Sequence, residues 1–192
     1  YLSNGSNVDM ITLSAHRCRI KSMRLDGNKA NQASGNGIYI SAGQLSSVED
    51  VEIWTCKENG LETTTVAVGP YIQMVYAYSN DASGFYVVDT DSVQIHMAYA
   101  VTNGVDGFNL DGQGLYATHI NADQNIRYGI RLVGSRGFLG SFTSYSNNDT
   151  DLMVYAVSDT TITNGDLLYY NVVGKRGTYK AGLTLIDSKR TT

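Results

Sequence analysis

Four acidic residues in the first two thirds of the chain have types and spacing that fit a reaction: Glu62, Asp89, Asp106 and Asp111. Hydrolysis of a glycosidic bond uses two carboxyl groups, about 5–5.5 Å apart for retention and about 6.5–9.5 Å apart for inversion of configuration. Neighbouring strands of a sheet lie about 4.8 Å apart. Carboxylates one or two strands apart can therefore meet either distance, and these four residues are our candidate catalytic groups.

Within this set, Glu62 or Asp106 would act as the general acid, and Asp89 or Asp111 as the base or nucleophile. Asp89 and Asp111 follow equivalent segments of the sequence and are expected to lie close together on one corner. A structural interpretation competes, because aspartates at corners also cap turns through bonds to the backbone. Glu62 is harder to explain in this way, since glutamate is not favoured in strands.

The element that must position these acids is a short motif that returns about every 22–24 residues. In each copy a turn residue is followed by an apolar, a variable and an apolar residue. Alternate residues of a strand point to opposite faces, so the apolar pair must face inward and the variable residue outward. The outward column reads Tyr39, Glu62, Tyr86, Asn109, Arg131, Met153 and Thr184.

A second apolar motif lies between these copies, at a spacing of about 21 residues. It weakens later in the chain. Its copies are Val51-Glu52-Ile53, Ile72-Gln73-Met74 and Val93-Gln94-Ile95, followed by His119-Ile120-Asn121 and Ser141-Phe142-Thr143.

Each unit thus holds at least two short strands, separated by Gly, Asn, Asp and Ser. A propeller blade needs about 40 residues, and a leucine-rich repeat needs a leucine frame that is absent. The pattern predicts an all-β parallel β-helix of about seven coils. The Asn-Gly and Asp-Gly pairs are expected at corners that need a positive φ.

The outward column also suggests how a polymer could be bound. Tyr39 and Tyr86 offer flat rings with polar tips on which a sugar can stack. Asn109 and Arg131 offer directional hydrogen bonds. Trp54, the only tryptophan, alternates outward after an apolar residue and adds another ring. In a competing interpretation, outward tyrosines simply favour strands and fill trimer or sheet-surface contacts.

Composition narrows the function classes. The chain of 192 residues has a formal net charge of −4 and a pI near 5.2, which argues against nucleic-acid binding. No apolar run is long enough to span a membrane. We expect one elongated domain over residues 1–192, and the sequence leaves open whether this is a segment of a longer chain.

Cysteine and histidine are too sparse to predict a bridge or a zinc site. Cys18 and Cys56 are far apart beside apolar residues, and we expect two free buried thiols. The three histidines are scattered without ligand spacing. We expect no cofactor, with a Ca²⁺ site built from Asp89, Asp91 and Asp111 as the alternative.

Three segments resemble a known family. Leu25-Asp26-Gly27-Asn28-Lys29-Ala30-Asn31-Gln32 and Gly35-Asn36-Gly37-Ile38-Tyr39-Ile40 look like the pectate-lyase-like β-helix domains of bacteriophage tailspikes. Asp106-Gly107-Phe108-Asn109-Leu110 is similar to an Asp-Gly-Phe-Asp-Leu segment of O-antigen-cleaving tailspikes, which supplies catalytic acids. Asp106 matches the first acid, Asn109 stands in place of the second, and Glu62 resembles the position of a further glutamate, although Tyr86 occupies the nearer copy.

That resemblance implies a right-handed β-helix that forms homotrimers on a virion tail or outside the cell. It also implies binding to a bacterial surface polysaccharide, often with cleavage. Our first hypothesis is therefore a polysaccharide hydrolase of the tailspike type. The alternatives are a non-catalytic glycan-binding adhesin or fibre segment, favoured by Asn109, and a polysaccharide lyase with Arg131 or Tyr86 as the base.

Overall fold

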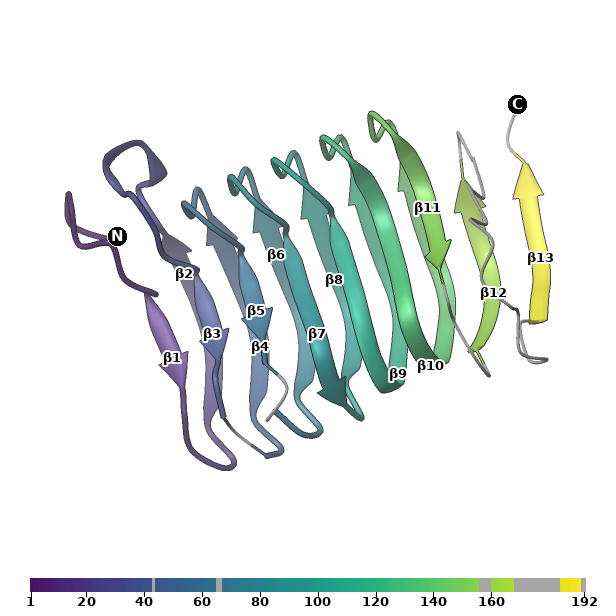
Figure 1. The fold of residues 1–192 in the computed structure, drawn as a ribbon, viewed down its shortest axis with the longest axis horizontal. Coiled ribbons are helices and arrows are strands. Elements are labelled where there is room, and N and C mark those ends of the chain that lie inside the picture. Colours follow the sequence, from purple (N-terminus) through teal and green to yellow (C-terminus); the bar gives the residue numbers. More distant parts are fainter. Residues whose placement is uncertain (43, 65–66, 156–159, 168–183, 191–192) are drawn as a thin grey trace.

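The chain forms an all-β parallel solenoid, seen in a computed structural model that describes residues 1–42, 44–64, 67–155, 160–167 and 184–190. Successive turns lie side by side along the long axis of the molecule (Figure 1). Within the described residues no α-helix occurs, and one short 3₁₀ turn, η1, covers Lys29–Asn31. The strands are β1 (Ile11–Leu13), β2 (Arg19–Asp26), β3 (Ile38–Ile40), β4 (Ser47–Trp54), β5 (Leu61–Thr63), β6 (Tyr71–Tyr78), β7 (Phe85–Asp91), β8 (Gln94–Val101), β9 (Phe108–Asp123), β10 (Tyr128–Tyr145), β11 (Thr150–Tyr155), β12 (Thr160–Leu167) and β13 (Thr184–Arg190).

The strands form two parallel rows. The row that we call face A contains β1, β3, β5, β7, the start of β9, the start of β10, and β11. The other row contains β2, β4, β6, β8, the ends of β9 and β10, β12 and β13. Within the described residues face A has seven rungs, which enclose about six complete turns, close to the seven coils expected from the period.

The second row bends along one line of residues with left-handed backbone angles. Met74, Met97 and His119 have φ values of 49°, 53° and 53°, and the strand register skips each of them. Ser22, Asp50 and Ser141 occupy the same line in other turns. The bend divides the row into face B before the line and face C after it, so each turn has three sides.

Several glycines at the corners do not have the backbone angles that the sequence predicted. The glycines that begin the repeats, such as Gly60 and Gly84, do not carry the positive φ; that conformation falls on non-glycine residues such as Thr55, Ser79 and Thr102. A Cβ on Gly60 would lie 2.7 Å from the carbonyl oxygen of Gly84 in the next turn. Glycine is therefore required by the close approach of adjacent turns.

The core consists of ladders of inward side chains, as alternation predicts. Ile38, Leu61, Phe85, Phe108 and Ile130 are fully buried on successive rungs of face A. The rings of Phe85 and Phe108 stack with centroids 4.7 Å apart. That separation equals the strand spacing, so identical side chains on adjacent rungs pack face to face.

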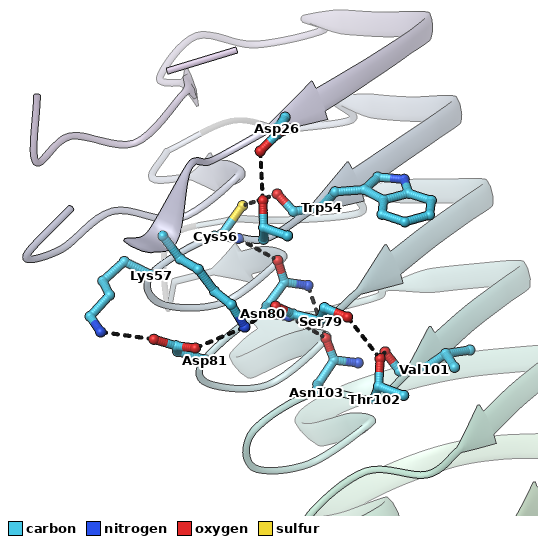
Figure 2. A network of polar contacts seen from close by, with 12 residues as sticks. Asp26, Trp54, Cys56, Lys57, Ser79, Asn80, Asp81, Val101, Thr102 and Asn103 are labelled. Carbon is cyan, nitrogen blue, oxygen red and sulfur yellow. Dashed lines mark hydrogen bonds and ion pairs between the residues drawn. The ribbon is translucent and has the colours of Figure 1, made fainter. Parts of the chain in front are cut away.

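A ladder of buried asparagines closes the corner between face C and face A. The Asn80 side chain donates through Nδ2 to Oδ1 of Asn103 at 2.9 Å, and Asn103 donates to Asn125 at 2.9 Å. Asn125 continues the ladder to Asn147. Figure 2 shows the start, where the backbone N–H of Cys56 donates to Asn80. The ladder satisfies backbone groups that the turn would otherwise leave unpaired in the interior.

Two details of the repeat were assigned wrongly from the sequence. Val51 pairs with Val75, whereas Ile72 pairs with Val48 and Ile95, so the second apolar motif mixed faces B and C. Thr184 pairs with Thr161 of β12 and does not continue the face A column. The error arose because both faces bury apolar residues at the same period, and spacing alone does not separate them.

Both cysteines are free, as expected. Cys56 is fully buried, and burial raises the pKa of its thiol to about 12, whereas Cys18 is only partly buried. A thiol with such a pKa is chemically inert at neutral pH. Across the part of the chain that the structure describes, we find no helix long and apolar enough to span a membrane.

Candidate functional site

The outward column predicted from the repeat exists on face A. Tyr39 lies beside Glu62, Glu62 beside Tyr86, Tyr86 beside Asn109, and Asn109 beside Arg131 on successive rungs. Asn109 is 5% exposed, and the other four side chains are partly buried. The solenoid therefore displays two phenol rings, a carboxyl group and a guanidinium in one line, with the buried amide of Asn109 between Tyr86 and Arg131.

Glu62 occupies an environment that favours its protonated form. Its Oε2 accepts a hydrogen bond of 2.8 Å from Nδ2 of Asn59, at the corner before the strand. Burial raises the pKa of Glu62, and the nearby charges of Glu58 and Asp9 raise it further, against the lowering effect of the Asn59 bond. A carboxyl group that keeps its proton more readily than usual is suited to act as a general acid.

Asn109 and Arg131 are coupled on adjacent rungs. Nη1 of Arg131 donates to Oδ1 of Asn109 at 2.8 Å. This bond holds the guanidinium along the face, where its other N–H groups can donate to a ligand. The uncharged amide of Asn109 thus orients Arg131 without neutralising it.

Asp111 shares this face with Glu62. It pairs with Val88 on one side and Val133 on the other, in the outward column next to that of Glu62. Two rungs and two residues separate the acids, which places their Cα atoms about 12 Å apart. Side chains that lean toward each other from this distance can reach the carboxyl separation of an inverting glycosidase.

Asp106 has a different environment from that of the other candidates. Its carboxylate is fully buried at the corner before Gly107 and accepts hydrogen bonds from Nε and Nη2 of Arg127, at 2.8 and 2.6 Å. The backbone N–H of Tyr128 adds a bond of 3.3 Å. A carboxylate bound by three donors favours a structural role in joining two turns.

Asp89 lies at an irregularity of the ladder, where the register shifts between Val88 and Thr90. Asp111 stands opposite Val88, and the side chain of Asp89 lies outside the described part of the chain. Among the described residues, no group of three or more His, Cys, Asp or Glu side chains could hold a metal ion.

Trp54 does not belong to this column, because it lies on face C. Its ring packs against Tyr78 with centroids 4.7 Å apart, and the guanidinium of Arg24 lies 4.4 Å from the ring centre. The ring points away from the polar network of the neighbouring corner (Figure 2). The sequence-derived binding set therefore divides between two faces.

Face C holds aromatic residues that the sequence reasoning missed. Tyr76 stacks on Tyr99 of the next rung with centroids 4.7 Å apart, and Tyr76 lies 6.2 Å from Tyr78. Tyr76 and Tyr99 are one repeat apart, as are Trp54 and Tyr78. The correct register of the second motif would have revealed both pairs from the sequence.

Comparison with solved structures supports the fold. The A-module of mannuronan C-5 epimerase AlgE4 from Azotobacter vinelandii superposes with a TM-score of 0.60 at 17% identity, over 85% of this chain and 57% of that module. The A-module of mannuronan C-5 epimerase AlgE6 from the same organism gives 0.57 at 12% identity, over 86% and 67%. The chain thus spans little more than half of the AlgE4 module.

At such low identity these likenesses show a right-handed, pectate-lyase-like β-helix and nothing finer. No protein-family model matches the sequence, and no curated protein resembles it closely enough to count as a relative.

Proposed function

We propose that this chain binds a polysaccharide along face A. The observation that carries the proposal is the line Tyr39, Glu62, Tyr86, Asn109 and Arg131 on consecutive rungs. Five rungs at strand spacing cover about 19 Å, enough for several sugar units in a row. Ring faces and directional hydrogen-bonding groups in one line fit an extended polymer better than a compact ligand.

The fold supports a carbohydrate-related role without deciding it. The two similar modules belong to enzymes that, by their names, act on mannuronan. A solenoid face is long and regular, which suits a partner with repeating units.

Hydrolysis of the bound polymer is the second candidate function, favoured by the environment of Glu62. This residue would donate a proton to the glycosidic oxygen, and Asp111 would activate a water molecule on the other side of the sugar. Breakage of the glycosidic bond and attack by water then give inversion of configuration. Asp106 is not assigned a role here, because Arg127 already binds its carboxylate.

The polymer, the assembly and the location remain proposals that rest on the tailspike-like segments at residues 25–40 and 106–110. On that basis the ligand is a bacterial surface polysaccharide, and the protein acts as a homotrimer on a virion tail or elsewhere outside the cell. Sedimentation equilibrium tests the assembly directly: a mass of three chains supports it, and a monomer at all concentrations contradicts it.

The decisive experiment measures binding and cleavage separately. Capsule and O-antigen preparations are first screened for retention by the parent protein, and a retained polymer is then assayed for new reducing ends. We expect Tyr86→Ala to weaken retention at least tenfold, because it removes a ring from the middle of the line. Asp149→Asn, an exposed acid outside face A, serves as the control and should change nothing.

Two further variants test the proposed hydrolysis. Glu62→Gln and Asp111→Asn should each lower the release of reducing ends at least a hundredfold while retention persists. Retention without cleavage by the parent would assign the chain to the non-catalytic binding class. An unsaturated product that absorbs in the near ultraviolet would indicate a lyase instead. If no polymer is retained by the parent, the whole proposal fails.

A further inference from the structure

Face C contains a hollow that plays no part in the site on face A. It is open to solvent and has a volume of about 330 Å³. This is at the lower end of the range for small-molecule sites, which begins at about 300 Å³. Buried Ile120 and Phe142 contribute to its lining, and the other lining residues are Tyr99, His119, Asn121, Ser141 and Thr143.

The aromatic stack of face C ends at this hollow. Tyr76 covers one side of Tyr99, with ring planes only 6° apart. The centroid distance of 4.7 Å matches the strand spacing, so the two rings stack from one rung to the next. On the other side of Tyr99 the next rung carries Asn121, and the rung after that carries Thr143. Because these side chains are small, the second face of Tyr99 is left toward the hollow.

The stack also fixes the orientation of Tyr99. Tyr76 contacts Tyr78, and Tyr78 contacts Trp54, which carries the Arg24 guanidinium on its ring. A ring held by packing loses little conformational entropy when a ligand binds to it. Tyr99 is therefore a preorganised flat wall, and sugar rings stack through their C–H faces on walls of this kind.

The rest of the lining supplies hydrogen-bonding groups without formal charge. Nδ2 of Asn121 donates to Oγ1 of Thr143 at 2.6 Å, which fixes the amide across the floor of the hollow. Ser141 and His119 stand on the corner line with left-handed backbone angles, at the rim. Among the described residues that line the hollow, none is a lysine, arginine, aspartate or glutamate.

The surroundings disfavour an anionic ligand. Asp123 follows Asn121 by two residues on the same outward face, so it stands beside the hollow. Its Oδ1 is buried without a hydrogen-bond partner. A carboxylate beside the hollow repels a carboxylate or sulfate of a ligand.

We propose that the hollow at Tyr99 is a binding subsite for a neutral hexopyranose unit of a polysaccharide. The sugar ring stacks on the outer face of Tyr99, and its hydroxyl groups pair with Asn121, Ser141 and Thr143. The subsite extends the proposed polysaccharide binding to a second face, and it is physically separate from the line on face A.

The test uses isothermal titration of the whole chain with hexamers of glucose, galactose and mannose in α and β linkage, and with a mannuronate hexamer as the charged counterpart. We expect at least one neutral hexamer to bind and the mannuronate hexamer to bind at least tenfold more weakly. Tyr99→Ala should weaken the neutral hexamer at least tenfold. Tyr116→Ala removes an exposed tyrosine from face B and should have no effect.

Thr143→Trp provides a second variant that leaves the aromatic stack intact and fills the hollow with an indole. It should abolish binding of the neutral hexamer while the melting temperature stays near that of the parent. The subsite is overturned if no neutral hexamer binds, if the mannuronate hexamer binds best, or if Tyr99→Ala and Tyr116→Ala bind alike.

The Tyr86→Ala variant distinguishes binding on face A from binding at the subsite on face C. Loss of binding in this variant, with full binding by Tyr99→Ala and Thr143→Trp, would overturn the subsite and leave the face A proposal standing. Loss of hexamer binding in Tyr99→Ala and Thr143→Trp, with full binding by Tyr86→Ala, would support the subsite. The same result would count against the proposed binding of the polymer on face A.

Discussion

Glu62 is the residue whose type and environment are least expected at its position in a strand. A glutamate between two tyrosine rungs gains little from packing, and its partial burial disfavours the ionised form. Asp106 illustrates the opposite case, because a bidentate arginine compensates a fully buried carboxylate. Two acids that look equivalent in the sequence therefore have different environments, one on an outward face and the other in a corner that joins turns.

Glu62→Gln should stabilise the protein at neutral pH. The pKa of Glu62 is raised above its ordinary value of 4.5, so its contribution to stability is present below that value and is lost as pH rises through the raised pKa. Glutamine cannot ionise and still accepts the bond from Asn59. Melting temperatures of parent and variant measured from pH 3.5 to 8 should differ most at the alkaline end and converge at the acid end. A constant difference, or a variant that is less stable at pH 8, would contradict the assignment.

Arg127→Leu should destabilise the fold by about 3 kcal/mol or more, because it leaves the buried carboxylate of Asp106 without its partner. Urea unfolding at pH 7 measures the loss. Arg19→Leu removes a surface ion pair with Glu49 and serves as the control, with an expected cost far smaller than that of Arg127→Leu. Equal costs for the two variants would show that the Asp106 pair is not structurally important.

At the scale of the elements, stability rests on ladders that cross the turns. The strands of face A at β1, β3 and β5 have only three residues each, too few to be stable alone. They persist because β1 pairs in register with β3, because β3 and β5 pair in register with the rungs on both sides, and because the asparagine ladder ties the later corners together. Local propensity therefore matters less here than the repetition of the same contact.

Asn103→Ala should cost about 3 kcal/mol, because it leaves buried partners of its amide in Asn80, Ala77 and Asn125 without their bonds, at roughly 1–3 kcal/mol for a group left unsatisfied. Chemical denaturation followed by circular dichroism provides the measurement. Asn148→Ala, at an exposed position two turns away, should change stability by less than about 0.5 kcal/mol. A similar small effect at Asn103 would mean that water replaces the ladder.

At the scale of the whole molecule, the protein is a stack in which each turn contacts only its neighbours. This arrangement makes the outer faces long and regular, and it places face A and face C on different rows of strands. Two outward lines of residues, one on each of these faces, can therefore coexist without sharing residues. It also means that stability is transmitted from turn to turn through interfaces such as the one between Phe85 and Phe108.

Phe85→Ala should destabilise the solenoid by about 3–5 kcal/mol, since it opens a cavity at an interface between two turns in the middle of the stack. Because Trp54 is the only tryptophan, its fluorescence reports one side of that interface, while circular dichroism reports the whole chain. We expect the two signals to coincide in the parent and to separate in the variant. Leu45→Ala, at a side chain that is 59% exposed, is the control and should leave both curves unchanged.

Much of this architecture follows from the sequence alone. The period and the alternation in copies such as Gly84-Phe85-Tyr86-Val87 fix a strand with two buried residues and one outward residue, because strand side chains alternate strictly. The order of the face A column from Tyr39 to Arg131 follows from the same rule, and the structure confirms it.

Only the tertiary structure decided which outward residues share a face. Trp54 lies on face C, and Asp106 lies in a corner beside Arg127. Tyr99 is the last ring of an aromatic stack that ends at a hollow. The physical reason is that a period sets the spacing along the chain, whereas the bend at residues such as Met97 and His119 sets the direction of each side. Non-glycine residues adopt those left-handed angles only because neighbouring turns hold them, and no local sequence rule reports that constraint.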